Sequence, residues 1–308
     1  MQQRYNYIDI AKGIGILLVI ALHSRFHIDW MVSFEMPLFF ILSGCFFKYD
    51  LPFKQFLKKK VNMLLIPYVF FELPKVLYDI ALSYNHRISI MDSYINSSVP
   101  TTTWFLLCLF EIQVICYFIY QIKSLNKWII VLMSFSIGYL MYKLNVPNIL
   151  FICSAVTSTS YFTLGLLTRN IITGSTKTST PPHSNIALSI SLLFLSFGLW
   201  YISKPYVFYR GNSLEGNFIQ IILMAILGSY GIIFLAKSIN SNKILEYYGR
   251  YSLIILGVHL YYLTFTSRCG CNIPPMFQFI ITCTLMLPTI YLLKKFVPRL
   301  CGIKPLIQ

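Results

Sequence analysis

Charged residues are scarce in this sequence. Only 11% of its 308 residues are charged, and ten are acidic, whereas 56% are hydrophobic and the mean hydropathy is +0.67. A soluble domain carries about 25% charged residues. This shortage excludes a soluble globular protein and predicts an all-α, polytopic integral membrane protein, with one domain over residues 1–308.

The sequence also lacks the local motifs of several enzyme classes. It contains no Gly-x-Ser-x-Gly segment, no glycine-rich phosphate loop and no pair of metal ligands at helical spacing. We therefore expect no metal site and no permanently bound cofactor. Repeats of solenoid period, low-complexity tracts and heptads are absent as well, which is consistent with a single helical domain.

Nucleic acid is the first partner that a net charge of +15 suggests. The basic residues, however, cluster beside the apolar runs, as the positive-inside rule of membrane proteins requires. Seventeen of the 25 Lys and Arg residues fall on the same side as the N-terminus, and six fall on the opposite side. This asymmetry predicts a cell (inner) membrane protein with both termini cytoplasmic, in contact with membrane lipids and not with nucleic acid.

Ten apolar runs are candidate membrane crossings, each of which needs about 20 residues. The second run is short, and we expect it to be tilted or broken. The predicted crossings are 7–24, 33–48, 61–82, 103–122, 127–144, 148–168, 186–203, 216–237, 251–268 and 276–297. Cys269 and Cys271 lie in a short loop and form either an oxidised pair or two free thiols.

The first run carries an acid, a base and a histidine. Lys12 and His23 are eleven residues apart, a spacing that closes three helical turns to within about 20°. Both therefore project from one face, about 16 Å apart along the axis, and Asp9 shares that face. Ionisable groups inside a crossing usually face a protein interior or a wet cavity. The alternative is an acid at the helix start, a snorkelling lysine and a histidine at the rim.

Five motifs follow one another along the chain. The first is Asp-Ile-Ala-Lys-Gly-Ile-Gly-Ile-Leu-Leu-Val-x-x-x-His at 9–23, with a basic-x10-His spacing. The others are Met-Pro-Leu-Phe-Phe-Ile-Leu-Ser-Gly at 36–44, Leu-Leu-Ile-Pro-Tyr at 64–68, Thr-Trp-Phe-Leu at 103–106 and Gly-Arg-Tyr-Ser-Leu-Ile-Ile-Leu-Gly-Val-His at 249–259. In this order, over most of the chain, they resemble the membrane acyltransferase-3 family.

The resemblance implies an integral-membrane O-acyltransferase. Such an enzyme would take an acetyl group from acetyl-CoA and transfer it to a hydroxyl of a cell-envelope glycan or a lipid-linked saccharide. The resemblance does not distinguish a hydroxyl from an amine as the group that is acylated. Because the chain ends at Gln308, we expect it to lack the esterase-like domain that some members of the family append.

Within that reaction, His23 is the candidate catalytic base. Neutral imidazole, with an unperturbed pKa of about 6.5, can accept the proton of an attacking hydroxyl. Lys12, three turns away, is better suited to holding the donor, and Asp9 is then its charge partner. An acyl-histidine relay through His23 is a competing mechanism, which these residues do not separate from base catalysis.

Lys60 is the candidate for binding the phosphates of the donor. It ends the run Lys58-Lys59-Lys60, whose ammonium groups either anchor the third crossing at the membrane surface or bind phosphate. The family carries a basic-x-x-basic pattern at this place. Lys60 fits its first position, and Met63 occupies the second.

Five further residues are candidate substrate-binding groups. Glu35 is expected near the outer end of the first crossing, where it orients the histidine, binds acceptor hydroxyls or is only a solvated loop acid. Trp104 is a pocket wall or an interfacial aromatic residue. His259 is a binding residue or a hydrogen-bonded structural histidine. Ser43, near the far end of the second crossing, and Glu111, deep in the fourth, complete the set.

Two other functions are compatible with a polytopic membrane protein. A transporter or flippase of a lipid-linked saccharide would suit ten crossings and buried charges equally well. Transporter folds often contain paired repeats, however, and the pattern of the first helix has no second copy here. A non-enzymatic membrane scaffold would leave the alignment of Lys12 with His23 unexplained.

Overall fold

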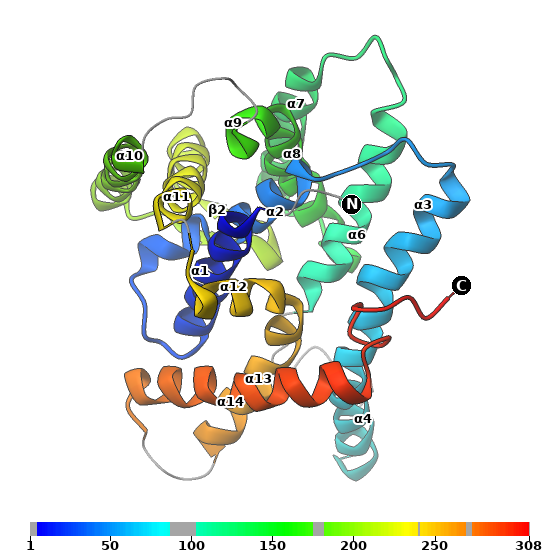
Figure 1. The fold of residues 1–308 in the computed structure, drawn as a ribbon. Coiled ribbons are helices and arrows are strands. Elements are labelled where there is room, and N and C mark those ends of the chain that lie inside the picture. The colour runs from blue at the N-terminus through cyan, green and yellow to red at the C-terminus, as the bar shows by residue number, and fades with distance from the viewer. Residues whose placement is uncertain (1–4, 87–102, 175–181, 240, 269–272, 308) are drawn as a thin grey trace.

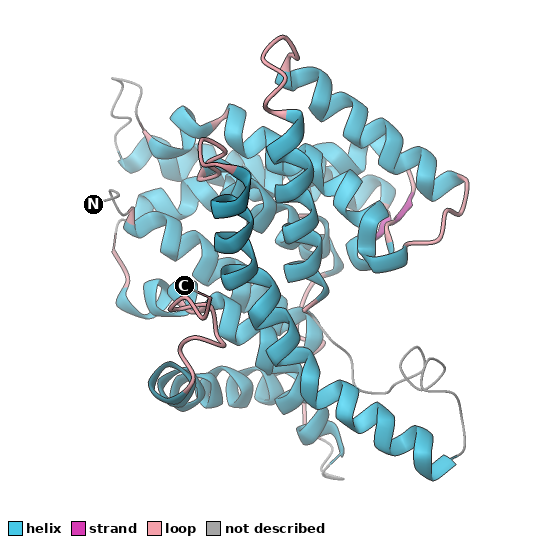
Figure 2. Cartoon of the chain, turned by 90° about the vertical axis from the view of Figure 1, so that its right-hand side faces the viewer, coloured by secondary structure: helices cyan, strands magenta, loops and turns pink. Residues whose placement is uncertain are grey.

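The computed structural model describes residues 5–86, 103–174, 182–239, 241–268 and 273–307. Within these ranges the chain is nearly all-α, as predicted, with one short two-stranded hairpin (Figures 1 and 2). The elements are α1 (Asn6–His23), η1 (Asp29–Ser33), α2 (Glu35–Cys45), α3 (Phe53–Lys60), η2 (Val61–Leu65), α4 (Ile66–His86), α6 (Trp104–Ile119), α7 (Lys127–Lys143), η3 (Ile149–Phe151), α8 (Ile152–Leu167), α9 (Arg169–Thr173), α10 (Pro182–Ser203), β1 (Tyr206–Phe208), η4 (Tyr209–Gly211), β2 (Ser213–Glu215), α11 (Phe218–Ile239), α12 (Lys243–Arg250), α13 (Ser252–Arg268) and α14 (Pro275–Phe296). Cys269 and Cys271 lie outside the described residues.

Six helical segments of the described chain are long and apolar enough to cross a membrane, judged by length and composition. They are Asn6–His23, Phe53–Tyr78, Ile149–Leu167, Ser184–Ser203, Phe218–Ile239 and Pro275–Phe296. Each of the ten predicted crossings overlaps a helix, yet the count of ten is not confirmed. The second crossing shows why: α2 has 11 residues, which at 1.5 Å each span about half of a bilayer's hydrocarbon core.

The first helix lies inside the bundle. Figure 1 shows α1 among α2, α11 and α12, and it also contacts α13. Ile10, Ile16 and Ile20 of α1 are almost completely buried, so this helix faces protein on several sides. The helix α10, in contrast, exposes large apolar side chains such as Phe194, as a lipid-facing helix does. The acidic, basic and histidine residues of α1, which are Asp9, Lys12 and His23, are half-buried on a helix that is surrounded by protein.

A close crossing joins α1 to α12. Gly13 of α1 faces the carbonyl oxygen of Leu245, and Gly249 of α12 faces the carbonyl oxygen of Asp9. A Cβ atom at either glycine would overlap the facing oxygen. Small residues are what allow helix backbones in membranes to approach this closely. The crossing fixes the first half of α1 against the end of α12.

The hairpin of β1 and β2, with the turn η4 between them, lies over the other end of α1. The hydroxyl of Tyr209 donates a hydrogen bond of 2.8 Å to the carbonyl oxygen of Ser33 in η1. Asn148 Nδ2 donates one of 2.8 Å to the carbonyl oxygen of Arg210. The sequence does not predict this hairpin, because two strands of three residues each are too short to show the alternating pattern of a β-strand. These bonds hold the turn beside the helices.

Candidate active site

A cavity of about 110 Å³ lies where the C-terminal end of α1 meets α2, α6, α13 and the hairpin, and we call it the histidine cavity. The charged or ionisable residues of its wall are His23 of α1, Glu35 at the start of α2 and Arg210 of η4. Its aromatic residues are Trp104 at the start of α6 and Phe208 and Tyr209 of the hairpin. The sequence predicts that Glu35 lies near the outer end of the first crossing and that Trp104 can form a pocket wall. The structure brings both to the same cavity as His23.

The ring of His23, the last residue of α1, is oriented by its own helix. Its Nδ1 lies 2.8 Å from the carbonyl oxygen of Val19. Because a carbonyl oxygen can only accept a hydrogen bond, the hydrogen of the neutral ring belongs on Nδ1. The other nitrogen, Nε2, then has a free lone pair. This is the tautomer that can accept a proton from a substrate at Nε2.

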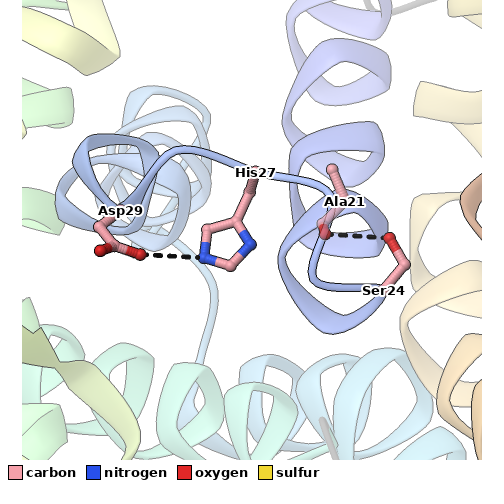
Figure 3. A network of polar contacts seen from close by, with 4 residues as sticks. All are labelled: Ala21, Ser24, His27 and Asp29. Carbon is pink, nitrogen blue, oxygen red and sulfur yellow. Dashed lines mark hydrogen bonds and ion pairs between the residues drawn. The ribbon is translucent and has the colours of Figure 1, made fainter. Parts of the chain in front are cut away.

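The turn after α1 is held by polar contacts of its own (Figure 3). Ser24 Oγ donates a hydrogen bond of 3.0 Å to the carbonyl oxygen of Ala21. His27 Nε2 lies 3.3 Å from the carboxylate of Asp29. These contacts fix the chain on the C-terminal side of the helix. His23 is therefore at a defined helix end.

A second histidine touches the first. His259 of α13 is completely buried, and its Nδ1 lies 2.8 Å from the carbonyl oxygen of Ile255, so this nitrogen carries the hydrogen of the neutral ring. Its Nε2 is then an acceptor, 3.4 Å from His23 Nδ1. The two rings meet edge to face, with centroids 5.1 Å apart. The hydrogen on His23 Nδ1 thus faces two acceptors, which favour the same tautomer.

Glu35 and Trp104 are buried, with 3% and 7% of their surfaces exposed. One carboxyl oxygen of Glu35, Oε2, has no hydrogen-bond partner among the described residues. A buried polar atom without a partner is costly, so an atom of this kind in a cavity wall indicates a ligand group or a water that completes it. Trp104 adds a flat aromatic face to the same cavity.

Arg210 is the charged residue of this cavity that the sequence does not reveal. In the sequence it is only one of the positive charges on the side opposite the N-terminus. It reaches the histidine cavity because the hairpin folds back over the end of α1. No local pattern signals a contact between segments so far apart in the chain.

A second cavity, of about 310 Å³, borders the first half of α1, and we call it the lysine cavity. Asp9 and Lys12 line it from α1, Ser43 from α2 and Arg250 from the end of α12. Most of the remaining wall is apolar and comes from α2, α6 and α13. The predicted neighbours Asp9 and Lys12 therefore share a cavity, and Arg250 adds a second cation to it.

The two cavities follow one side of α1. The residues of this helix that line them are Asp9, Lys12, Ile16, Val19, Leu22 and His23. Apart from Leu22, they recur every three or four positions, which is the spacing of one helix face. The cavities also share two wall residues, Met36 of α2 and Leu256 of α13. Lys12 and His23 thus face the same side of α1 and border neighbouring cavities.

Three candidate residues line neither cavity: His259, which contacts His23 from behind the wall, and the more distant Lys60 and Glu111. The ammonium group of Lys60 is 5.3 Å from the ring centroid of Phe47 and 5.4 Å from that of Phe56, in cation–π contacts. Glu111, on α6, lines neither cavity, and its Oε2 has no hydrogen-bond partner among the described residues. For Lys60 and Glu111 a role in substrate binding stays a prediction.

The side chains at the two cavities are suited to acid–base chemistry and to binding polar substrates. They offer a histidine with a free lone pair, two carboxylates and several cations. In the described part of the chain, no group of three His, Cys, Asp or Glu side chains could hold a metal ion. The six described cysteines are free thiols, and five of them are buried.

Comparison with known proteins gives a match over nearly the full chain. The sequence model of a family described as an acyltransferase domain matches residues 5–295. No curated protein and no solved structure matches the chain. The matched range contains every residue that lines the histidine and lysine cavities.

Proposed function

Because this chain belongs to the membrane acyltransferase-3 family, and so is a multi-pass membrane acyltransferase, we propose that it transfers acetyl groups from acetyl-CoA to a hydroxyl of a glycan. The glycan would be a cell-envelope polysaccharide or its lipid-linked precursor. One observation carries the proposal: two cavities lie along one face of α1, with Lys12 at one and His23 at the other. They offer separate places for a donor and an acceptor, which would meet at Met36 and Leu256.

The chemistry of acetyl-CoA suits the lysine cavity. Lys12 and Arg250 supply positive charge for its phosphates, since ammonium and guanidinium groups both bind phosphate. The apolar walls suit the pantetheine arm, and the hydroxyl of Ser43 can bond to one of its amides. In this arrangement the thioester lies toward the wall that the two cavities share, and Asp9 is the charge partner of Lys12.

A sugar suits the histidine cavity. The unpartnered Oε2 of Glu35 can accept a hydrogen bond from a sugar hydroxyl, which removes the cost of leaving that atom unsatisfied. The indole of Trp104 can cover the apolar face of a sugar ring. Arg210 can donate to further oxygens of the acceptor. The acceptor hydroxyl would then lie next to His23.

His23 is the general base of the proposed reaction. Its Nε2 takes the proton of the acceptor hydroxyl while the hydroxyl oxygen attacks the thioester carbonyl carbon. The C–S bond then breaks, and coenzyme A leaves as a thiol after receiving the proton from Nε2. While the imidazole is charged, its Nδ1 hydrogen is held by the carbonyl of Val19 and by Nε2 of His259. An acyl-histidine relay would use the same Nε2 as a nucleophile.

The proposed topology has ten crossings with both termini in the cytoplasm of a cell with an inner membrane. It is supported by the excess of Lys and Arg on the side of the N-terminus. Lys12 is then nearer the cytoplasm and His23 nearer the outside. The short helix α2 is tolerable in such a protein because it is buried against α1, α8 and α11, away from lipid.

The direct test uses purified protein in lipid nanodiscs with acetyl-CoA that carries a labelled acetyl group. A lipid-linked saccharide from the same cell envelope serves as the acceptor. We expect label on the saccharide and release of free coenzyme A. Movement of the saccharide across a vesicle bilayer without acetylation would identify a transporter and contradict the proposal. Mass spectrometry of envelope glycans, with and without the gene, then identifies the natural acceptor.

A further inference from the structure

A third hollow, of about 460 Å³, lies between the end of α3 and residues 302–307, which we call the C-terminal segment. We call this space the basic hollow. Three of its lining residues are lysines: Lys58 and Lys59 from α3, and Lys304 from the C-terminal segment. None of the described residues that line it is acidic. The hollow therefore gathers positive charge from two segments that are far apart in the sequence.

The C-terminal segment is held at the hollow by one buried amide. Asn62, which is 6% exposed, accepts hydrogen bonds at Oδ1 from the backbone N–H groups of Leu306 (2.7 Å) and Ile307 (2.8 Å). Its Nδ2 donates to the carbonyl oxygens of Ile307 (3.1 Å) and Lys58 (2.9 Å). All four hydrogen-bonding positions of the amide are thus used, three of them on the C-terminal segment. We call this set of bonds the Asn62 clamp, and Lys304 lies two residues before Leu306, the first residue that it holds.

The local backbone explains how the two segments come so close. Asn62 lies in η2, a single π-helical turn between α3 and α4, and turns of this kind frequently occur at functional sites. Gly302 has a φ of 70°, in the left-handed region that glycine adopts without strain. A Cβ at Gly302 would lie only 3.2 Å from the carbonyl oxygen of Met63. A glycine at this turn allows the segment to pass close to η2.

The hollow adjoins the proposed donor site. Met63 lines both the basic hollow and the lysine cavity, so the two spaces share a wall. Lys60, the residue that the sequence favours for phosphate binding, does not line the hollow, and its ammonium group lies over the rings of Phe47 and Phe56. Of the lysine run before the third predicted crossing, Lys58 and Lys59 face the hollow.

We propose that the basic hollow is a binding site for a phosphate-bearing ligand, in which Lys304 of the clamped C-terminal segment completes the site begun by Lys58 and Lys59. Ammonium groups bind phosphate as point charges, and three of them around one space suit a phosphate dianion or a pair of linked phosphates. Two sources carry this chemistry. One is the phosphate end of the acyl donor, a choice that rests on the proposed function, and the other is the headgroup of an anionic phospholipid.

The test compares variants of the full-length protein in nanodiscs of neutral lipid. Lys59→Gln and Lys304→Gln remove one charge each from the hollow, and Lys54→Gln is the matched control, because Lys54 is an exposed residue of α3 that does not line it. The dissociation constant for coenzyme A is measured by calorimetry. In parallel, native mass spectrometry counts the phosphatidylglycerol that each variant retains from a mixed-lipid membrane.

If the ligand is the donor, each hollow variant should raise the dissociation constant for coenzyme A roughly tenfold, and Lys54→Gln should not. If the ligand is a phospholipid, the hollow variants should lose bound phosphatidylglycerol while their affinity for coenzyme A is unchanged. Wild-type affinity and wild-type lipid retention in both hollow variants would overturn the proposal. Failure of the wild-type protein to bind coenzyme A would instead refute the proposed acyl donor, while the lipid measurement still decides this site.

Asn62→Leu tests the C-terminal segment without changing any charge. It removes the clamp, so ligand binding should weaken about as much as in Lys304→Gln. Unchanged binding in Asn62→Leu would show that Lys304 needs no clamp, and this part of the proposal would be wrong. A size-exclusion profile equal to that of the wild type identifies the variants that are folded.

Discussion

His259 is expected to act on the reaction only through His23. It is completely buried, and its Nε2 is a second acceptor for the hydrogen on His23 Nδ1. Replacing it with leucine fills the space with an apolar side chain of similar size but removes that acceptor. Replacing it with glutamine keeps an acceptor oxygen at a similar reach. The two variants therefore separate the hydrogen bond from the packing.

The size of the effect follows from the distances. A hydrogen bond to a charged group contributes about 1.5–3 kcal/mol, and His23 becomes charged only when it takes the acceptor proton. The contact between His23 and His259 is 3.4 Å, longer than a typical bond, whereas the bond to Val19 is 2.8 Å and stays in place. The lower end of the range applies, so His259→Leu should lower kcat roughly tenfold.

The assay is steady-state transfer of labelled acetyl groups, with both substrates varied. His259→Leu should lower kcat with little change in the KM of either substrate, because His259 lines neither cavity. His259→Gln should recover most of the rate. Equal losses of kcat in the two variants would mean that His259 acts through packing alone. A wild-type kcat in His259→Leu would refute the view that the second acceptor stabilises the charged ring.

Three further predictions concern the substrates and the topology. Glu35→Gln keeps the shape of the side chain but weakens it as a hydrogen-bond acceptor, so it should raise the KM for the saccharide several-fold and leave the KM for acetyl-CoA unchanged. A raised KM for acetyl-CoA with an unchanged KM for the saccharide would mean that Glu35 binds the donor. Lys60→Ala should raise the KM for acetyl-CoA with acceptor affinity nearly unchanged, as the sequence predicts, and an unaltered donor KM would leave Lys60 as an anchor over Phe47 and Phe56. Ser124 and Asn145 flank α7, so reporter fusions after Ser124 should report the cytoplasm and fusions after Asn145 should report the outside. The reverse result would place His23 on the cytoplasmic side and contradict the proposed topology.

The arrangement on α1 could be predicted because it depends on one helix. Eleven residues return a helix to nearly the same face, and Lys12 and His23 do line neighbouring cavities on one side of α1. Composition likewise predicts a nearly all-α chain, because apolar runs of about 20 residues cross a bilayer as helices, which satisfy their backbone hydrogen bonds internally. These conclusions need no knowledge of which helices touch.

The rest of the site depends on contacts between distant segments. Arg210 reaches the histidine cavity on a hairpin whose strands are too short to leave a pattern. Lys304 reaches the basic hollow because Asn62 binds the C-terminal segment, and a single asparagine gives no signal of its partner. The ammonium group of Lys60 lies over two aromatic rings, a contact that its place in a lysine run does not signal. The number of crossings also stays open, because α2 has only 11 residues and α6, α7 and α13 have 16 or 17.

The central claim is that His23 is the base that activates the acceptor hydroxyl, and His23→Ala tests it most directly. The measurement is the turnover number for transfer of labelled acetyl groups, alongside the dissociation constant for coenzyme A. Loss of a general base costs about 10²–10⁴ in rate, so the variant should bind coenzyme A normally and lose nearly all transfer. Wild-type turnover in His23→Ala would contradict the claim and leave His23 as a residue at the rim of the first helix.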